Sequence, residues 1–340
     1  MGWPTPQEYN EAIQNPLTAF ADPELRSGKP VLTPLGLPRP ITGAFASVYQ
    51  LACAGGRTVA VRCFLRDFGD HQDRYAAISA HLAAARLPYM TNFTYLANGI
   101  RVNGRWYPVL KMDWLEGESL QTYIERNLQR PDALRSLAEQ WVQMAKLLRS
   151  ASIGHGDLQH GNVIVAGGQL RLIDYDGMYV PALAGRTSHE IGHRNYQHPQ
   201  RSERDFGPNI DHFSTWVVYT SLVALSVQPQ LWRDYAGGDE CLIFRREDFE
   251  RPASSPLLRS LENAADPRLA DLADIFHSVV LLPPDRVPPI DGPLAWPATA
   301  NASVVGSLSA RTAAPASGPG ASAAGAGSPL CSAGHRDRGI

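Results

Sequence analysis

Three oxygen-bearing side chains stand at spacings that suit the transfer of a phosphoryl group. Asp157 and Asn162 lie five positions apart in the segment HGDLQHGN, and Asp174 follows Asn162 by twelve positions, behind an apolar run. Phosphoryl transfer requires a carboxylate that accepts a hydroxyl proton and oxygen ligands that hold magnesium on the phosphates. Asp157, Asn162 and Asp174 supply such a set, and their order along the chain favours a chemical role over a purely structural one.

The composition excludes several other kinds of site. The chain of 340 residues carries a net charge of −2, so no basic surface for nucleic acid or for an anionic membrane is expected. Its 4 cysteines show neither a disulfide framework nor metal-ligand spacing. The sequence does not open on a basic region followed by an apolar run, and its longest apolar stretch, residues 216–227, is about half of a membrane span. We therefore expect a cytoplasmic protein, long enough for one large core or two smaller ones.

The residues that position these side chains divide into a β-rich part and a helical part. Between residues 41 and 112, alternating apolar residues predict two hairpins, one turning at Gly-Gly and one at Asn-Gly, with a single helix between them. From residue 113 to residue 291 helical spacing prevails, most clearly over residues 131–150 and 211–226. These patterns predict an α+β chain with a small β-rich lobe, 41–112, and a larger helical lobe, 113–291.

Both ends of the chain differ in composition from the two lobes. Residues 1–40 are rich in proline, and Thr5 followed by Glu8 has the form of a capping box. We expect a short docking helix there, followed by a proline-rich connector. Residues 292–340 are largely Ala, Gly, Ser and Pro, which cannot bury enough apolar surface to offset the entropy of ordering. This tail is predicted to be disordered.

Seven segments follow one another in an order that a single superfamily shares. They are TGAFASVYQ, VAVR, LKMDWLEGESL, HGDLQHGN, Asp174-Tyr175-Asp176-Gly177, GHRNYQHPQ and DHFSTW. Over residues 41–285 they resemble motifs of the protein-kinase-like superfamily. In the same order, these motifs are the glycine-rich loop, the V-A-I-K strand, the adenine-binding strand and hinge, the H-R-D-x-x-x-x-N loop, the D-F-G motif, the end of the activation segment and the start of the central helix.

The resemblance implies a bilobal protein-kinase-like fold that binds ATP in the cleft between its lobes. Asp157 would be the catalytic base, and Asn162 and Asp174 would bind magnesium. The nucleotide-binding residues that it implies are Gly43 in the loop, Val48 and Ala60 over the adenine, Arg62 at the phosphates, and the backbone of Asp113 and Leu115 at the adenine edge, with Met112 in the gatekeeper place.

The phosphate-binding part departs from the superfamily's pattern. The lysine of V-A-I-K is Arg62, and no lysine stands in the predicted strands before it. Strand alternation turns Lys111 away from the cleft if Met112 faces inwards. The predicted helix of the small lobe contains no glutamate, so Arg62 lacks its usual acid partner and Asp73 is the available candidate.

Further departures concern the loops. Only Gly43 remains of three glycine positions, which restricts the approach of the backbone to the phosphates. Gly156 replaces the arginine that usually receives a phosphorylated activation loop, so this control is expected to be missing. Gln159 replaces a charged lysine, which is expected to cost some rate. The remaining expectations are that Asp70 caps the small-lobe helix, that His155 and Asp211 are structural, that Asp176 is solvated, and that Trp106 and Trp114 pack in the core or hinge.

The sequence leaves three functions open. A protein kinase acting on Ser or Thr is favoured, because Gly192, Tyr196 and Pro199 match a segment that presents an extended peptide. A small-molecule kinase, like the aminoglycoside or choline kinases, is the second, since their catalytic loops often begin His-Gly-Asp. A pseudokinase that binds a partner without turnover is the third. The chain also resembles bacterial kinase-like proteins encoded near a metal-dependent protein phosphatase and a von Willebrand A-type protein, which makes these two candidate partners.

Overall fold

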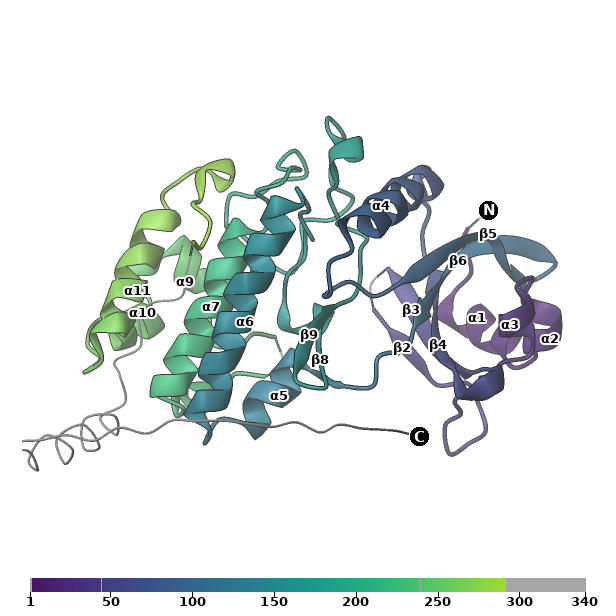
Figure 1. Cartoon of the computed structure of the whole chain (residues 1–340), viewed down its shortest axis with the longest axis horizontal. Coiled ribbons are helices and arrows are strands. Elements are labelled where there is room, and N and C mark those ends of the chain that lie inside the picture. Colours follow the sequence, from purple (N-terminus) through teal and green to yellow (C-terminus); the bar gives the residue numbers. More distant parts are fainter. Residues whose placement is uncertain (1, 44, 239, 292–340) are drawn as a thin grey trace, which may run out of the picture. The chain divides into compact units, whose positions relative to one another are not determined.

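The structure of the protein is a computed structural model that describes residues 2–43, 45–238 and 240–291. These residues form one compact unit with a β-rich N-terminal lobe and a larger helical lobe (Figure 1). The α+β, bilobal architecture expected from the sequence is therefore confirmed. The predicted tail, residues 292–340, lies outside the described residues. None of the described helices is long and apolar enough to cross a membrane.

An antiparallel sheet forms the small lobe, and its two predicted hairpins are confirmed. The strands are β1 (Lys29–Pro30), β2 (Pro40–Thr42), β3 (Ala46–Ala52), β4 (Thr58–Phe64), β5 (Phe93–Val102) and β6 (Arg105–Asp113). They lie in the order β1-β3-β4-β6-β5, with β2 also pairing with β3. The β5–β6 turn uses Asn103 and Gly104 with φ of 49° and 82°, which fits the right-handed twist of a hairpin.

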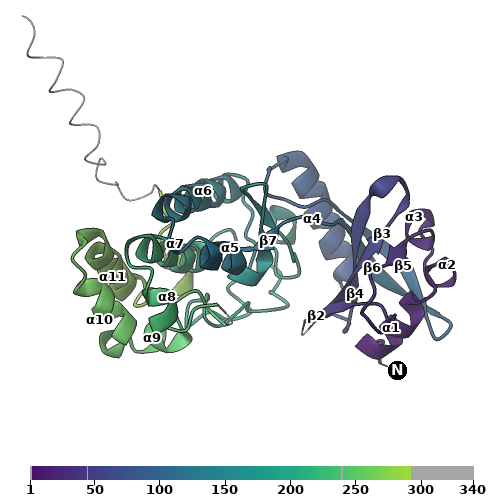
Figure 2. The ribbon, with the colours of Figure 1, turned by 90° about the horizontal axis from the view of Figure 1, so that it is seen from below.

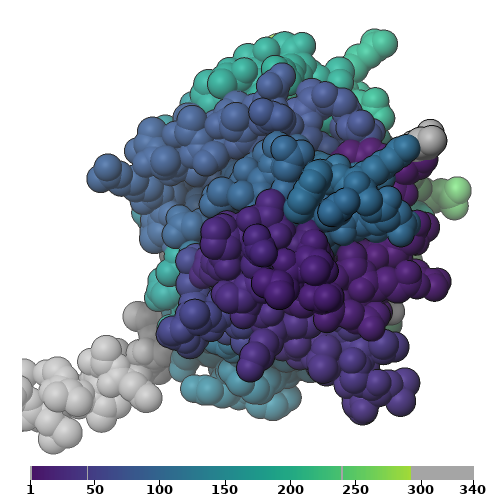
Figure 3. Space-filling view, turned by 90° about the vertical axis from the view of Figure 1, so that its right-hand side faces the viewer, coloured from purple at the N-terminus to yellow at the C-terminus, as the bar shows by residue number. Residues whose placement is uncertain are grey.

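Alternation along the strands gives this sheet two different faces. On β4, Val59, Val61 and Cys63 pack against the N-terminal segment, whereas Ala60 and Arg62 face the other lobe. The segment contributes α1 (Pro6–Ile13), α2 (Pro16–Ala19) and α3 (Pro23–Arg26). Figure 3 shows these purple residues lying across this side of the small lobe. Elsewhere in the small lobe, a 3₁₀ turn, η1 (Ala54–Gly56), connects β3 to β4.

The N-terminal segment confirms the predicted capping box but not a continuous helix. Thr5 and Glu8 bond each other reciprocally at the start of α1, and Tyr9 and Ile13 are buried. The helix ends at Ile13 because Pro16 starts a separate short turn, and Leu17 is 60% exposed instead of sharing the apolar stripe. Residues 5–26 therefore dock on the sheet through several short helices.

Helix α4 (His71–Ala85) covers the opposite side of the small lobe (Figures 1 and 2). Asp70 occupies the predicted N-cap position of α4, but its side chain makes no capping hydrogen bond. Asp70 instead binds Arg74, Arg186 and His189. Trp106, expected to pack, is 42% exposed at the β5–β6 hairpin.

The helical lobe is built around two helices that lie side by side in Figures 1 and 2, α6 (Pro131–Ser150) and α7 (His212–Val227). Trp141 of α6 donates its indole N–H to the carbonyl of Thr215 on α7 at 3.1 Å. Around them lie α5 (Leu120–Arg126), α8 (Leu231–Asp234), α9 (Arg246–Glu250), α10 (Pro256–Glu262) and α11 (Pro267–Val279). A small sheet of β7 (Glu118–Ser119), β8 (Val163–Ala166) and β9 (Gln169–Leu172) and the turns η2 (His160–Asn162), η3 (Pro181–Leu183), η4 (Pro252–Ser254) and η5 (Pro284–Arg286) complete the lobe.

Candidate active site

A cavity of about 430 Å³ lies where the two lobes meet. Its lining includes the predicted magnesium ligands Asn162 and Asp174 and the gatekeeper Met112. The predicted nucleotide-binding residues also line it: Gly43, Val48, Ala60, Arg62, Asp113 and Leu115. Asp157 is not among the lining residues, but its carboxylate contacts the lining residue Asn162 at 2.8 Å.

Strand register explains why these side chains converge. Val48 on β3 lies directly opposite Arg62 on β4, and Ala60 lies opposite Met112 on β6, so all four share one face of the sheet. Lys111 points to the other face, where its ammonium group binds Asp22 at 2.6 Å. The expected outward orientation of Lys111 is therefore confirmed.

Arg62 is held by two carboxylates that follow β9. One guanidinium nitrogen, Nη1, donates to Oδ1 of Asp174, and the other, Nη2, donates to Oδ2 of Asp176 at 2.5 Å. Tyr75 of α4 donates its hydroxyl to the second oxygen of Asp176. The expectation that Asp73 partners Arg62 is thus wrong, because Asp176 takes that position. The expectation that Asp176 is solvated is also wrong, since its side chain is only 7% exposed.

Burial and neighbouring charges separate the acidities of the carboxyl groups around Arg62. Burial raises the pKa of Asp176 to about 6, although the charge of Arg62 opposes this shift. For Asp174, burial acts in the same direction, but the attraction of Arg62 outweighs it and leaves the pKa below its ordinary value. Burial, followed by repulsion from Asp174 and Asp176, raises the pKa of Glu190 to about 9. Glu190 is therefore a neutral acid at pH 7.

The loop that carries Asp157 is fixed from behind by Asp211. The Asp211 carboxylate accepts hydrogen bonds from the backbone N–H groups of His155 and Gly156, the latter at 2.9 Å. A ring nitrogen of His155 lies 3.0 Å from the carbonyl oxygen of Ile173. The structural roles expected for His155 and Asp211 are confirmed.

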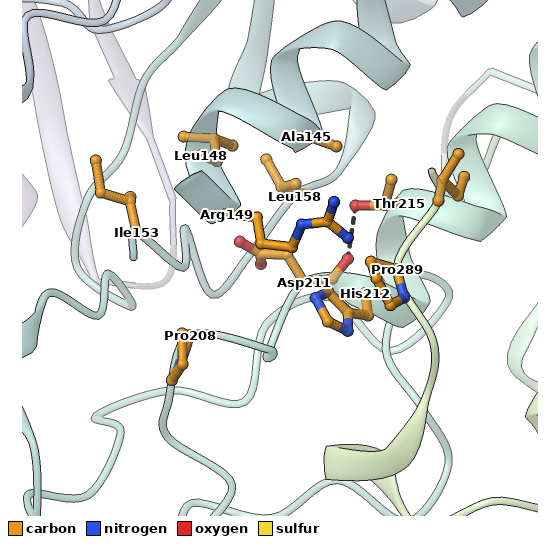
Figure 4. Close-up of a pocket in the computed structure, with 11 residues that line it drawn as sticks. Ala145, Leu148, Arg149, Ile153, Leu158, Pro208, Asp211, His212, Thr215 and Pro289 are labelled. Carbon is orange, nitrogen blue, oxygen red and sulfur yellow. Dashed lines mark hydrogen bonds between the residues drawn. The ribbon is translucent and has the colours of Figure 1, made fainter. Parts of the chain in front are cut away.

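Figure 4 shows the hollow beside Asp211, where the hydroxyl of Thr215 donates to the Asp211 carbonyl at 2.7 Å. The volume of this hollow is about 20 Å³, which is room for a single water molecule. This hollow is therefore too small for a substrate.

Gly156 explains why the superfamily's arginine is absent from this loop. The backbone of Gly156 has a φ of +84°, and a Cβ atom there would overlap the carbonyl oxygen of Gly177. Nearby, Gly154 and Tyr179 exchange two backbone hydrogen bonds, of 3.1 and 2.7 Å. The loop and the segment after Asp174 thus approach too closely for a side chain at position 156.

Both oxygens of Asp157 are engaged. Oδ1 accepts the backbone N–H of His193 at 2.7 Å, and Oδ2 accepts the amide of Asn162 at 2.8 Å. Gln159 is farther, at 3.4 Å from Oδ2. Burial raises the pKa of Asp157, and the His193 N–H opposes the shift. Each carboxylate oxygen keeps a second lone pair, so Asp157 can still accept a hydrogen bond from a substrate hydroxyl.

The donor set fits a divalent cation of the magnesium type. Asn162 uses its amide nitrogen towards Asp157, which leaves its carbonyl oxygen for another partner. The backbone of Asp174 is left-handed, with φ of 65°, and its carboxylate contacts Arg62 through one oxygen. Amide and carboxylate oxygens are the ligands that magnesium prefers. Within the described residues no group of three His, Cys, Asp or Glu side chains is assembled, so phosphate oxygens and water would have to complete the coordination of a cation held by Asn162 and Asp174.

The start of α4 is tethered to the segment that precedes Glu190. The Asp70 carboxylate binds Arg74 at 2.8 Å, His189 at 2.8 Å and Arg186 at 3.2 Å. Arg74 also donates to the carbonyl oxygen of Thr187 at 2.6 Å. Burial, followed by the charge of Arg74, lowers the pKa of His189 to about 4, so this tether holds a neutral histidine at pH 7.

Sequence reasoning missed four residues of the site. Tyr75 stood on the predicted apolar stripe of α4, and its hydroxyl was the available signal for a polar partner. Asp176 and Glu190 gave no local signal, since burial decides their roles. Arg201, 7% exposed, donates to the Gly156 carbonyl oxygen at 2.8 Å and brings a positive charge beneath the loop.

Comparison with known proteins gives limited similarity. No family model matches the chain. Calcium-dependent protein kinase 24 of Arabidopsis thaliana is 27% identical over 140 residues, which cover 40% of this chain and 24% of that protein. The match therefore spans about a quarter of the length of that relative. Among solved structures, the Cydia pomonella Granulovirus kinase PK-1 is similar with a TM-score of 0.44 and 14% identity, over 59% of this chain and 70% of that one.

The fold class follows from the architecture together with the cleft. A small antiparallel sheet flanked by α4, a connection at Asp113 to Leu115 and a helical lobe that carries the loop of Asp157 are all present. The fold is protein-kinase-like. What such a fold does in this chain is a separate matter, which depends on the side chains of the cleft.

Proposed function

We propose that this chain is an ATP- and magnesium-dependent phosphotransferase of the protein-kinase type, acting on Ser or Thr hydroxyls of a protein. The observation that carries the proposal is the cavity between the lobes. Apolar side chains line one part of it, including Val48, Ala60 and Met112, while Arg62, Asn162 and Asp174 lie at its polar part. A nucleotide has the same division, with an apolar base and a charged phosphate chain.

The connection between the lobes suits the edge of the base. The backbone N–H groups of Asp113 and Trp114 already bind the carbonyl oxygens of Asn92 and Thr58, both at 3.2 Å. In the proposed complex Asp113 therefore contributes its carbonyl oxygen, and Leu115 contributes its backbone. The planar guanidinium of Arg62 suits bidentate contact with phosphate oxygens.

Each polar residue then has a defined task. Asp157 accepts the proton of the substrate hydroxyl, while the His193 N–H helps to hold its carboxylate in place. Asn162 holds Asp157 in place through its amide nitrogen and offers its carbonyl oxygen, with Asp174, to magnesium. Bound magnesium would neutralise charge on the phosphates. Gln159 can donate a hydrogen bond but adds no charge, so we expect slow transfer.

An ordered segment beside Asp157 supports a protein substrate over a small molecule. Tyr196 is fully buried, and its hydroxyl lies 2.5 Å from Nδ1 of His160 in the catalytic loop. Asn195 binds the carbonyl oxygen of Glu240 at 3.0 Å, which joins the same segment to the helical lobe. The His-Gly-Asp opening, which favoured a small-molecule kinase, is accounted for by the close approach of Gly156 and Gly177.

One observation favours a second candidate, a nucleotide-binding regulator without turnover. In the structure the His193 N–H contacts Asp157, and the guanidinium of Arg62 contacts Asp174 where a metal ion would bind. A chain that stays in this arrangement would bind a partner and transfer nothing. The metal-dependent phosphatase and the von Willebrand A-type protein remain the proposed partners in either case.

Incubation of the chain with ATP and magnesium, followed by intact-mass measurement and a nucleotide-binding titration, distinguishes the candidates. We expect mass increments of one phosphate on the chain or on an added protein substrate. Asp157→Asn should abolish them while nucleotide affinity stays within a few-fold. Binding without any increment would favour the regulator, and a chain that binds no nucleotide would refute both.

A further inference from the structure

Arg62, Asp176 and Tyr75 form a continuous buried chain of contacts from β4 to α4. We infer that Tyr75 and Asp176 are positioning residues that anchor Arg62 to α4, so that Asp174 is free to exchange Arg62 for the metal. This inference rests on the proposed function. It assigns to a tyrosine and to the second aspartate of Asp174-Tyr175-Asp176 the task that a glutamate on the helix performs in the superfamily pattern.

The two carboxylates that bind Arg62 differ in their surroundings. The side chain of Asp174 is 35% exposed and lines the cavity, whereas that of Asp176 is 7% exposed and does not. Asp176 also accepts a second hydrogen bond, from Tyr75. A ligand that enters the cavity therefore meets Asp174 and leaves Asp176 covered.

Tyr75 is fixed firmly enough to act as an anchor. It is 2% exposed and lies among three aromatic rings, one from β4 and two from β5. The ring centroids of Phe64, Phe93 and Tyr95 are 5.8, 5.5 and 5.7 Å from that of Tyr75, and the Tyr95 ring is nearly parallel to it. Because the ring cannot turn without disturbing this cluster, the position of α4 sets the position of the hydroxyl and hence of Asp176.

The geometry of Arg62 allows the exchange without leaving a buried charge unpaired. Its two terminal nitrogens bind different carboxylates, Nη1 to Asp174 and Nη2 to Asp176. When nucleotide and metal enter, Nη1 can turn from Asp174 to the phosphates while Nη2 keeps its contact with Asp176. A buried cation that lost both partners would be costly, and the anchor prevents this.

The test is the affinity for a fluorescent ATP analogue, measured with magnesium and with EDTA. Asp176→Asn should weaken binding with magnesium by about ten- to a hundredfold, the range for a charge-assisted hydrogen bond. Tyr75→Phe should weaken it by about three- to tenfold. The double variant should bind no more weakly than Asp176→Asn alone, because Tyr75 acts through Asp176. Losses that multiply in the double variant would overturn the inference.

Two controls separate anchoring from packing. Tyr95→Phe removes a hydroxyl from the same ring cluster and should leave affinity unchanged. Asp174→Asn should remove the difference between magnesium and EDTA, whereas Asp176→Asn should retain it. An Asp176→Asn variant that loses this difference would show that Asp176 is itself a metal ligand.

The unfolding free energy of the nucleotide-free chain tests the anchor independently of nucleotide binding. Failure of the anchor can therefore be told apart from failure of the proposed function. If the wild-type chain binds no nucleotide, the proposed function fails. The anchor is still measured, since the effects of Tyr75→Phe and Asp176→Asn on the unfolding free energy should be non-additive. Additive effects there would refute the anchor whatever the chain binds.

Discussion

Arg62 makes contacts that a lysine cannot reproduce. Its two nitrogens bind two carboxylates, whereas an ammonium group on a flexible stem is a single point charge. We expect Arg62→Lys to lower the unfolding free energy by about 2 kcal/mol, the range for one lost charge-assisted hydrogen bond at a buried group. Urea denaturation at pH 7 measures this, with Lys111→Arg as the comparison. Equal stability of wild type and Arg62→Lys would show that one of the two contacts is absent in solution.

Glu190 makes stability depend on pH. Its pKa is raised to about 9 from the ordinary value of 4.5, so between these pH values the folded chain keeps a proton that the unfolded chain loses. Stability from this group is therefore greatest below pH 4.5 and falls as pH rises towards 9. We expect Glu190→Gln, which mimics the neutral acid, to unfold at a higher temperature than wild type at pH 8. The two curves should converge near pH 4.5, and parallel curves from pH 5 to pH 9 would contradict the assignment.

Residues that belong to short contiguous motifs could be predicted from the sequence. Contacts between segments that lie far apart in the sequence could not. Asp157, Asn162 and Asp174 belong to two short motifs, and the cavity is lined by the two that were expected to hold magnesium. Arg62 and Asp176 lie 114 positions apart, and Tyr75 and Asp176 lie 101 apart. Residue type gave no reason to join them. Only packing of α4 against the segment after β9 brings them together.

At the scale of elements, Asp70 and Arg74 tie α4 to the segment after residue 185. Asp70 binds Arg74, Arg186 and His189, and sequence reasoning had assigned it only a helix cap. We expect Asp70→Asn to increase amide hydrogen exchange both at the start of α4 and over residues 186–190. Asp73→Asn, an exposed acid on the same helix, should change neither region.

If amide hydrogen exchange in Asp70→Asn increased only in α4, Asp70 would not hold residues 186–190 in place. Because residues 186–190 lie just before His193, the tether also joins α4 to the segment whose backbone N–H contacts Asp157. The hairpins and the long helices were predictable from alternation and helical spacing. This tether was not, because charged residues in loops carry no periodic pattern.

At the scale of the molecule, the two ends of the chain should differ in their importance. Residues 1–28 contribute Tyr9, Ile13, Phe20 and Leu25 to the core of the small lobe. Removing them would uncover an apolar face, so we expect an insoluble or unfolded chain. Removing residues 292–340 should leave unfolding temperature and nucleotide affinity unchanged. Circular dichroism melts and nucleotide titration of both truncations test this, and a soluble, binding-competent chain without residues 1–28 would contradict the first expectation.

The cover that the N-terminal helices provide has a consequence for the order of folding during synthesis. Residues 5–26 leave the ribosome before their partners, as helices of at most 8 residues that are too short to be stable alone. Their partners on β4, β5 and β6 follow between residues 58 and 113. Residues 5–26 must therefore wait, unfolded and with their apolar side chains accessible, until the chain has been made as far as residue 113. Residues 5–113 would then fold together in one step, which makes the pace of translation over this stretch a determinant of yield.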